Sequence, residues 1–142
     1  MVKRVLVPVD GSEHASHACD LVIENFPDAT LVLLHVINPA EAGYSAQASI
    51  PSFSEEWYEQ QKQQAEDIFD EVESKATDND VAVERVVEVG KPTRVIVEYA
   101  EDHDVDHIVM GSHGRSGVSR ILLGSVAESV VRNSPVPVTI VR

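Results

Sequence analysis

Three glycines and one serine in this chain have a spacing that suits the binding of a phosphate group. Gly111 and Gly114 follow the apolar run at 108–110, and Gly124 and Ser125 precede a helical pattern. Glycine permits positive φ angles and lets an anion approach the backbone. The first turn of a helix adds unpaired N–H donors and a partial positive charge. If the amides of 111–114 and 124–127 converge on one concavity, the pattern predicts binding of a nucleotide.

The spacing differs from those of better-known phosphate loops. The chain has no G-x-x-x-x-G-K-[ST], and no G-x-G-x-x-G follows its first strand pattern. Two glycines three residues apart are a weak signal alone. Ser125 and Glu128 also have the spacing of a capping box, which needs no ligand. From the spacing alone, phosphate binding and a turn followed by a helix cap are both open.

Length and composition predict one compact domain over residues 1–142. We expect no signal peptide and no membrane span, because the apolar run near the N-terminus is short and broken by Pro8 and Asp10. The single cysteine, Cys19, excludes an internal disulfide and favours the cytoplasm. Its helical spacing with neighbouring apolar residues indicates core packing rather than a reactive thiol.

The net charge of −13, with 24 acidic and 11 basic residues, argues against nucleic acid and anionic membranes as partners. An acid-rich, lysine-poor composition is typical of a halophilic protein, although an acidic mesophilic protein also fits. The charge is uneven: residues 107–142 hold four arginines and one acid, Glu128. The glycines thus lie in a segment with few acidic residues, as the binding of a polyphosphate requires. The alternative explanation for the small number of acids is that this part of the chain is more buried.

Strand and helix patterns alternate along the chain and predict an α/β fold. Strands separated by helices pair in parallel, so we expect a doubly wound five-stranded sheet of order 3-2-1-4-5 with helices on both faces. Ligands bind where such a strand order reverses, here between the first and fourth strands. The loop at 38–54 has the length of a lid or a mobile segment. The expected strands are 3–9, 30–37, 81–89, 106–110 and 136–141, and the helices are 12–26, 55–76, one from Pro92, and 125–133.

Four segments together resemble the universal stress protein family over essentially the whole chain. They are Val-Pro-Val-Asp-Gly-Ser at 7–12, the segments 108–117 and 122–127, and the C-terminal run 134–142. The ATP-binding branch of that family is marked by G-x2-G-x9-G-[ST], and this chain meets every position of the motif. The resemblance therefore implies an ATP-binding protein with a regulatory role in stress survival.

The resemblance also implies the site and the assembly. Asp10 would lie against the ribose or the phosphates, Val36 would offer backbone groups to adenine, and His113 would border the phosphates. Mg²⁺ or Mn²⁺ would be held mainly by the nucleotide, with no metal site of protein ligands. A homodimer would form through the last strand, 136–141. The expected nucleotide-binding residues are Pro8, Val9, Asp10, Val36, Met110, Gly111, His113, Gly114, Gly124, Ser125, Val126 and Ala127.

Two other functions are weighed against a regulatory ATP-binding protein. A slow ATPase or phosphotransferase would need a base and an electrophile, for which Asp10 and Arg115 or Arg120 are the candidates. We therefore expect at most weak hydrolysis and assign no catalytic residue. A nucleotide-free dimer would use the glycine loop only as structure. For His113, the alternative to a contact with phosphate is an incidental position in the loop. We expect His14 and His17 on a solvated helix face, where they bind no metal.

Overall fold

The computed structural model describes residues 2–41, 55–113 and 123–142. Five parallel strands form one sheet in the order β3-β2-β1-β4-β5, which confirms the predicted class and topology. Most of the predicted loop at 38–54 lies outside the described residues. The strands are β1 (Arg4–Pro8), β2 (Thr30–Ile37), β3 (Val83–Val89), β4 (His107–Gly111) and β5 (Val138–Val141).

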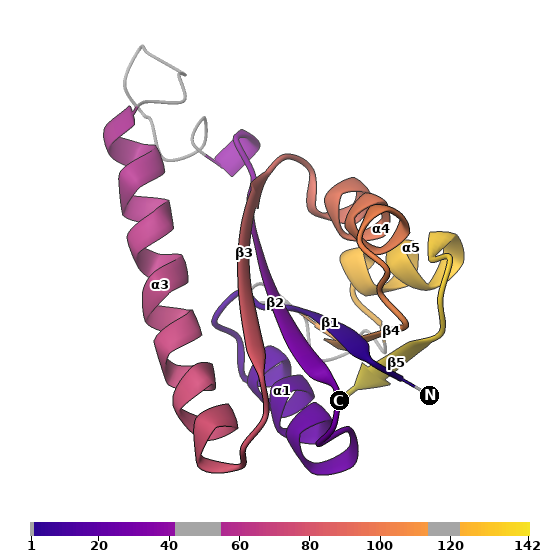
Figure 1. The fold of residues 1–142 in the computed structure, drawn as a ribbon. Coiled ribbons are helices and arrows are strands. Elements are labelled where there is room, and N and C mark those ends of the chain that lie inside the picture. The colour runs from indigo at the N-terminus through magenta and orange to yellow at the C-terminus, as the bar shows by residue number, and fades with distance from the viewer. Residues whose placement is uncertain (1, 42–54, 114–122) are drawn as a thin grey trace.

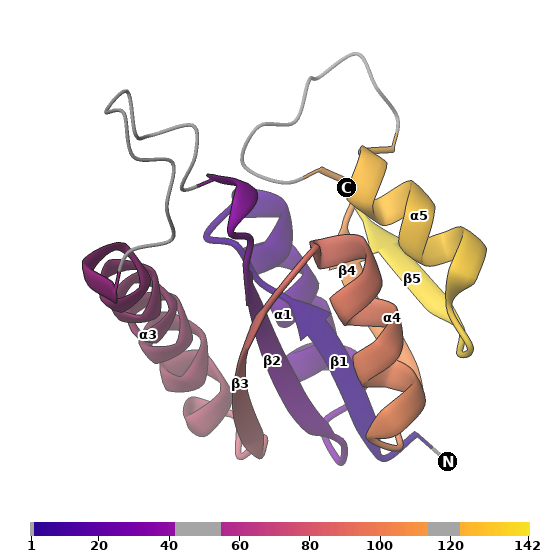
Figure 2. The same ribbon diagram turned by 90° about the horizontal axis from the view of Figure 1, so that it is seen from above.

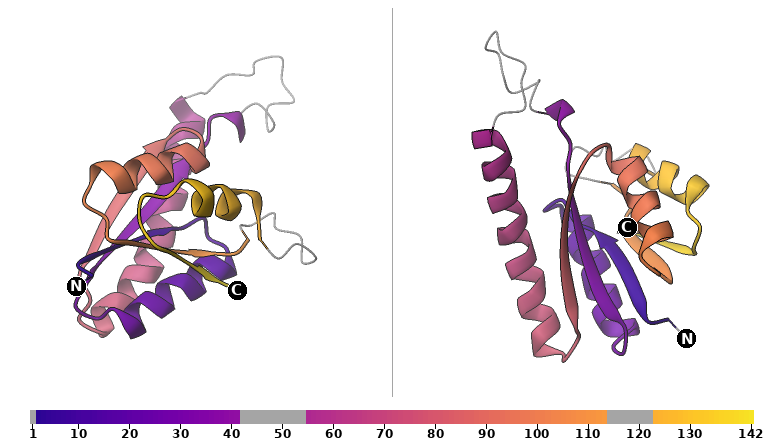
Figure 3. Two further views of the ribbon diagram at one scale, coloured as in Figure 1. Left: turned by 90° about the vertical axis from the view of Figure 1, so that its right-hand side faces the viewer. Right: turned by 45° about the horizontal axis from the view of Figure 1, so that its top comes forward.

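Helices cover both faces of the sheet, as predicted (Figure 1). On one face lie α1 (Glu13–Asn25) and α3 (Glu55–Asp78), and on the other lie α4 (Pro92–Asp102) and α5 (Ser125–Asn133). Figure 2 shows the sheet between these two pairs, and both views in Figure 3 show α4 beside α5. Each pair closes its own apolar core against the sheet.

The central strands are buried on both sides because each face of the sheet has a helix layer. Val5, Leu6 and Val7 in β1 alternate between the two cores and are all fully buried. This burial explains why β1 and β2 are apolar without alternation. Cys19 belongs to the core under α1, where burial raises the pKa of its thiol to about 12. The thiol is therefore protonated near neutral pH, as expected of a packing residue.

Two strand starts lie two residues later than predicted because backbone donors are missing or already used, and the ends of β1 and β4 differ from the prediction by one residue. Strand β5 begins at Val138 rather than at Val136, since Pro137 has no N–H and the Val136 N–H is donated to the Ser134 hydroxyl at 3.1 Å. Strand β3 begins at Val83 rather than at Val81, because the Val81 N–H returns to the Ala76 carbonyl at the end of α3. Proline chemistry and a helix terminus thus shorten both edge strands.

Asp106 joins the starts of β1 and β4. One oxygen of its carboxylate accepts hydrogen bonds from the Lys3 and Arg4 amides, both at 2.9 Å. These two bonds hold the pKa of Asp106 below its ordinary value. The carboxylate therefore stabilises the fold above the ordinary pKa, and this contribution is lost as the pH falls through the lower folded pKa.

We expect Asp106→Ala to lower the free energy of unfolding at neutral pH more than Asp106→Asn does. The asparagine amide oxygen can still accept both bonds but lacks the charge. Urea unfolding at about pH 7 and about pH 3 measures the effect, and the difference between wild type and Asp106→Asn should shrink at the lower pH. An equal difference at both pH values would contradict the assigned role of the charge.

The described residues contain neither a membrane-spanning helix nor a group of side chains that could bind a metal ion. Among the helices of residues 2–41, 55–113 and 123–142, none combines the length and the apolar character needed to cross a membrane. Within the same ranges, no three His, Cys, Asp or Glu side chains are grouped so that they could hold a metal ion.

Candidate functional site

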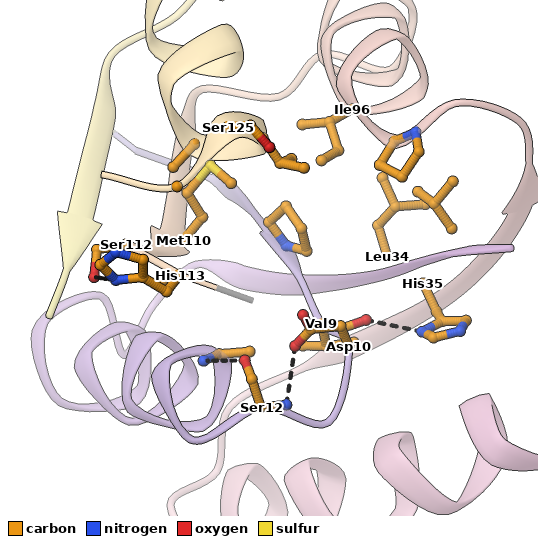
Figure 4. Close-up of a pocket in the computed structure, with 18 of the residues that line it drawn as sticks. Val9, Asp10, Ser12, Leu34, His35, Ile96, Met110, Ser112, His113 and Ser125 are labelled. Atoms are coloured by element: carbon orange, nitrogen blue, oxygen red, sulfur yellow. Dashed lines mark hydrogen bonds between the residues drawn. The ribbon is translucent and has the colours of Figure 1, made fainter. Parts of the chain in front are cut away.

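A cavity of about 400 Å³ opens at the carboxyl ends of β1 and β4, where the strand order reverses (Figure 4). This is the position at which doubly wound sheets bind ligands. Eleven of the twelve sequence-predicted residues line it, and the twelfth, Gly114, lies outside the described residues. The structure thus brings together the ends of β1, β2 and β4 and the start of α5. The eleven are Pro8, Val9, Asp10, Val36, Met110, Gly111, His113, Gly124, Ser125, Val126 and Ala127.

The end of β1 is fixed by hydrogen bonds on both sides of Val9. The Val9 amide donates to the Leu34 carbonyl at 2.9 Å, and the Val9 carbonyl lies 2.8 Å from Nδ1 of the buried His35. Because a carbonyl can only accept, His35 carries a proton on Nδ1. Asp10 follows, and one of its carboxylate oxygens accepts the Ser12 amide at 2.9 Å. This turn holds Asp10 at the rim of the cavity.

An apolar wall and a polar end divide the cavity. Leu34 and Val36 of β2, Ile96 of α4 and Met110 of β4 form the apolar side. The polar end lies at the start of α5, where Ser125, Val126 and Ala127 make up the first helical turn. The apolar wall suits a planar base, whereas the backbone N–H groups of the turn suit an anion.

The start of α5 differs from the expected capping box. Gly124, not Ser125, is the N-cap residue, and no side chain caps the helix. The Glu128 carboxylate pairs with Arg132 at 2.9 Å and does not reach back to the cap. The capping-box alternative is therefore wrong, because Ser125 already lies inside the helix. Among the described residues, no partner is found for the amides of Ser125, Val126 and Ala127, so these donors are open to a ligand.

The motif glycines have a different purpose from the one expected. Among the described glycines, only Gly11 and Gly90 have positive φ, so the expectation fails for Gly111 and Gly124. Gly111 is the last residue of β4, and a Cβ on it would lie 2.6 Å from Cβ of His14. A Cβ on Gly124 would lie 3.0 Å from the Ser112 carbonyl oxygen. These two glycines allow close approach of backbones rather than an unusual turn.

Two of the amides expected to face a phosphate are used within the protein. The Ser112 amide donates to the Val141 carbonyl at 2.8 Å, and the Gly124 amide donates to the Ser112 carbonyl at 2.7 Å. These bonds fix the strand end beside the helix start. Among the described residues, the amides that remain to face a phosphate include those of the first turn of α5, at Ser125, Val126 and Ala127, and Gly114 lies outside the described residues.

Of the two histidines expected on a solvated face of the first helix, only His17 lies there. His14 is half-buried, and its Nδ1 lies 3.0 Å from the hydroxyl of the buried Ser112, so the expectation of a solvated face is wrong for it. His17 is exposed, as expected. The ring of His113 lies on the other side of Ser112 and lines the cavity.

Comparisons with known proteins show the family of this chain. The model of the universal stress protein family matches residues 1–142. The chain belongs to the universal stress protein family. The universal stress protein MJ0577 of Methanocaldococcus jannaschii is 33% identical over an alignment that covers all of this chain and 96% of that protein.

Solved structures share the fold of this universal stress protein. The structure of MJ0577 superimposes with a TM-score of 0.86 at 34% identity and covers 99% of this chain and 96% of that one. A universal stress protein in complex with cAMP has a TM-score of 0.67 and 27% identity, with coverage of 99% and 97%. An Arabidopsis thaliana family protein with AMP bound shares the fold at a TM-score of 0.68 and 21% identity, with coverage of 98% and 90%.

Sequence reasoning missed nine lining residues of the universal stress protein. Most are distant in sequence and enter through packing, so periodicity gave no signal for them. His35 is an exception, because it interrupts the apolar residues 31–37 of β2. Ser112 lies inside the motif but between its defining positions. The missed residues are Ser12, Ala15, Leu34, His35, Glu41, Gln61, Pro92, Ile96 and Ser112.

Gly111→Ala tests the close approach of β4 and α1. The added Cβ would also lie 2.8 Å from the backbone carbonyl carbon of His14, which cannot swing away as a flexible side-chain end can. We expect a loss of about 1–3 kcal/mol in the free energy of unfolding, as for other overpacked sites. Denaturant unfolding measures it. A variant as stable as wild type would show that the two backbones can separate at no cost.

Proposed function

We propose that this universal stress protein binds ATP in the cavity and acts as a homodimeric regulatory protein in the cytoplasm. One observation carries the proposal: residues selected by the motif and the family resemblance line a single cavity at the reversal of strand order. A relative with 27% identity that is complexed with cAMP supports an adenine nucleotide as the ligand.

Each part of ATP has a matching part of the cavity. Adenine lies along the apolar wall, with backbone groups of Val36 at its edge and Met110 beneath it. The ribose hydroxyls donate to the carboxylate of Asp10, because direct contact of that acid with phosphate would be repulsive. The triphosphate lies at the first turn of α5, beside His113. Before entropy costs, three or four charge-assisted contacts of about 1.5–3 kcal/mol each total about 5–12 kcal/mol, a range that includes the ~8 kcal/mol of micromolar affinity.

Backbone donors, rather than basic side chains, would hold the phosphates. Among the described residues that line the cavity there is no lysine or arginine. A site of this kind binds a polyphosphate but lacks the cationic clamp of a fast phosphoryl-transfer enzyme. The electrophile candidates Arg115 and Arg120 lie outside the described residues. We therefore favour regulatory binding over the alternative of an ATPase or phosphotransferase, and expect at most slow hydrolysis.

Mg²⁺ or Mn²⁺ would arrive with the nucleotide. The carboxylate of Asp10 fits this arrangement, since it can accept a hydrogen bond from a water on the ion. The ion would neutralise part of the phosphate charge. The protein itself would contribute the orientation of the nucleotide.

The edge of β5 that does not pair with β4 is the proposed homodimer surface. In the described sheet β5 is terminal, and its four residues are all half-buried. An open apolar edge needs cover, and a short antiparallel pairing of residues 136–141 across a twofold axis would supply it.

The acidic surface is in keeping with a halophilic protein, with neither nucleic acid nor membrane as partner. Light scattering in high and low salt measures the assembly, and a monomer at every salt concentration would refute the dimer.

Calorimetry with a nucleotide series tests the binding proposal. With Mg²⁺ present, ATP should bind with a micromolar Kd, and ADP, AMP and adenosine progressively more weakly as donors at α5 lose their partners. GTP should bind weakly, because guanine exchanges the donor and the acceptor that adenine would offer to the backbone of Val36. A chain that binds none of these at millimolar concentration contradicts the proposal. A turnover assay on the same samples separates regulation from the ATPase alternative.

A further inference from the structure

Two imidazole rings flank one buried hydroxyl at the end of β4. Nδ1 of His14 lies 3.0 Å from Oγ of Ser112, and the same Oγ lies 3.1 Å from Nδ1 of His113. The hydroxyl is almost completely buried, since Ser112 is 1% exposed. The two rings meet edge to face with centroids 5.5 Å apart. Figure 4 shows the contact between Ser112 and His113 at the wall of the cavity.

The other nitrogen of His113 is buried and unused. Its Nε2 is inaccessible to solvent and has no hydrogen-bond partner among the residues that the structure describes. The neighbouring ring carbon Cδ2 lies 3.8 Å from the position that a Cβ would take on Gly124, the N-cap of α5. This edge of the ring therefore lies beside Gly124, at the helix start near which the proposed function places the phosphates. A buried polar atom without a partner calls for one.

The protonation of one ring nitrogen of His113 determines the protonation of the other. A neutral imidazole carries one proton, on Nδ1 or on Nε2. A phosphate oxygen only accepts, so Nε2 must carry the proton if it is to serve a phosphate. Nδ1 is then a bare acceptor, and the Ser112 hydroxyl must donate its single proton to it. The remaining lone pairs of Oγ accept from Nδ1–H of His14.

We propose that His14 and Ser112 are positioning residues that fix His113 as the Nε2–H tautomer and so turn its buried N–H toward the phosphates of a bound nucleotide. The donors all run in one direction, from His14 through Ser112 to His113. The inference rests on the proposed ATP site. It assigns a purpose to α1, which the binding motif does not include. Proteins commonly set the tautomer of a functional histidine through a hydrogen bond to its other ring nitrogen.

The tautomers are measured directly in the nucleotide-free protein. Imidazole ¹⁵N spectra distinguish a protonated nitrogen from a bare one. We expect the Nε2–H form for His113 and the Nδ1–H form for His14. An Nδ1–H form of neutral His113 would overturn the proposal whether or not ATP binds. If the tautomers are as expected but no nucleotide binds, the proposed function fails and the hydrogen-bond order stands.

Affinity measurements with matched variants give the second test. Ser112→Ala should weaken ATP binding about 5–10-fold, the loss of one oriented hydrogen bond, and leave adenosine binding unchanged. His14→Ala should do the same, whereas His14→Asn, whose amide can place a donor near the position of Nδ1, should retain most of the affinity. His17→Ala on the exposed side of α1 is the control and should have no effect.

A double variant separates positioning from general damage. His113→Gln keeps an amide donor near the position of Nε2 but removes Nδ1, so the hydroxyl no longer orients it. In that background Ser112→Ala should cost little further ATP affinity, and the two effects should be strongly non-additive. Additive losses, or equal losses for ATP and adenosine, would overturn the proposal. Urea unfolding of each variant confirms that the fold is intact, and the tautomer measurement on wild type decides the question if a variant does not fold.

Discussion

Ser125→Asp should abolish ATP binding while leaving the fold at least as stable as that of the wild type. Ser125 is exposed at the first position of α5, and Gly124 before it caps the helix without a side chain. An aspartate in the first turn is favourable for a helix by about 0.3–1 kcal/mol, because it faces the positive end of the dipole. The same carboxylate would compete for the amides and repel the phosphates. We expect the Kd to rise by at least about 100-fold, or 2.7 kcal/mol.

The matched control for this variant is Ser125→Ala. It removes at most one hydroxyl contact, so the Kd should rise by about 3–10-fold, and helix stability should change little because Ser125 is not the cap. Calorimetry with ATP and with adenosine, together with thermal unfolding, distinguishes the two variants. If Ser125→Asp binds ATP as well as Ser125→Ala does, the phosphates do not lie at the start of α5.

Phe69→Ala should cost about 3–5 kcal/mol of the free energy of unfolding, the range found for large-to-small changes in closed cores. Phe69 is fully buried on α3 and belongs to the core under α1 and α3. The guanidinium of Arg85 lies 5.7 Å from the centre of its ring and binds Glu66, Asp70 and Glu73 of the same helix. Those ion pairs are partly exposed and contribute little by themselves. The aromatic ring therefore supplies much of what holds α3 to the sheet.

Phe69→Leu is the control, because it keeps most of the apolar volume and should cost about 1–1.5 kcal/mol. Urea unfolding followed by circular dichroism measures both variants, and the slope of the transition shows whether the unfolding stays cooperative. If the alanine variant loses under about 1 kcal/mol, the core collapses around the lost ring or α3 is not docked on the sheet as described.

The sequence by itself determined the class of fold and the strand order, and it selected eleven of the twenty described residues that line the cavity. Apolar runs without alternation marked the two-sided burial of β1 and β2, and the alternation of strand and helix required parallel pairing. The motif and the resemblance selected residues that line one cavity, because the reversal of strand order in such a sheet has a fixed place. Local patterns carry this information, since backbone periodicity and helix starts depend on neighbouring residues.

Only the tertiary structure decided which contacts the residues around the cavity make. The start of α5 at Gly124 is set by its contact with the Ser112 carbonyl, and the need for glycine at 111 comes from where β4 and α1 meet, rather than from spacing. The roles of His14 and His35 likewise depend on partners that are 98 and 26 residues away in the chain. Hydrogen bonds and close contacts of this range are set by the packing of whole elements. A sequence pattern reports what an element is, and the packed fold decides what each of its polar atoms contacts.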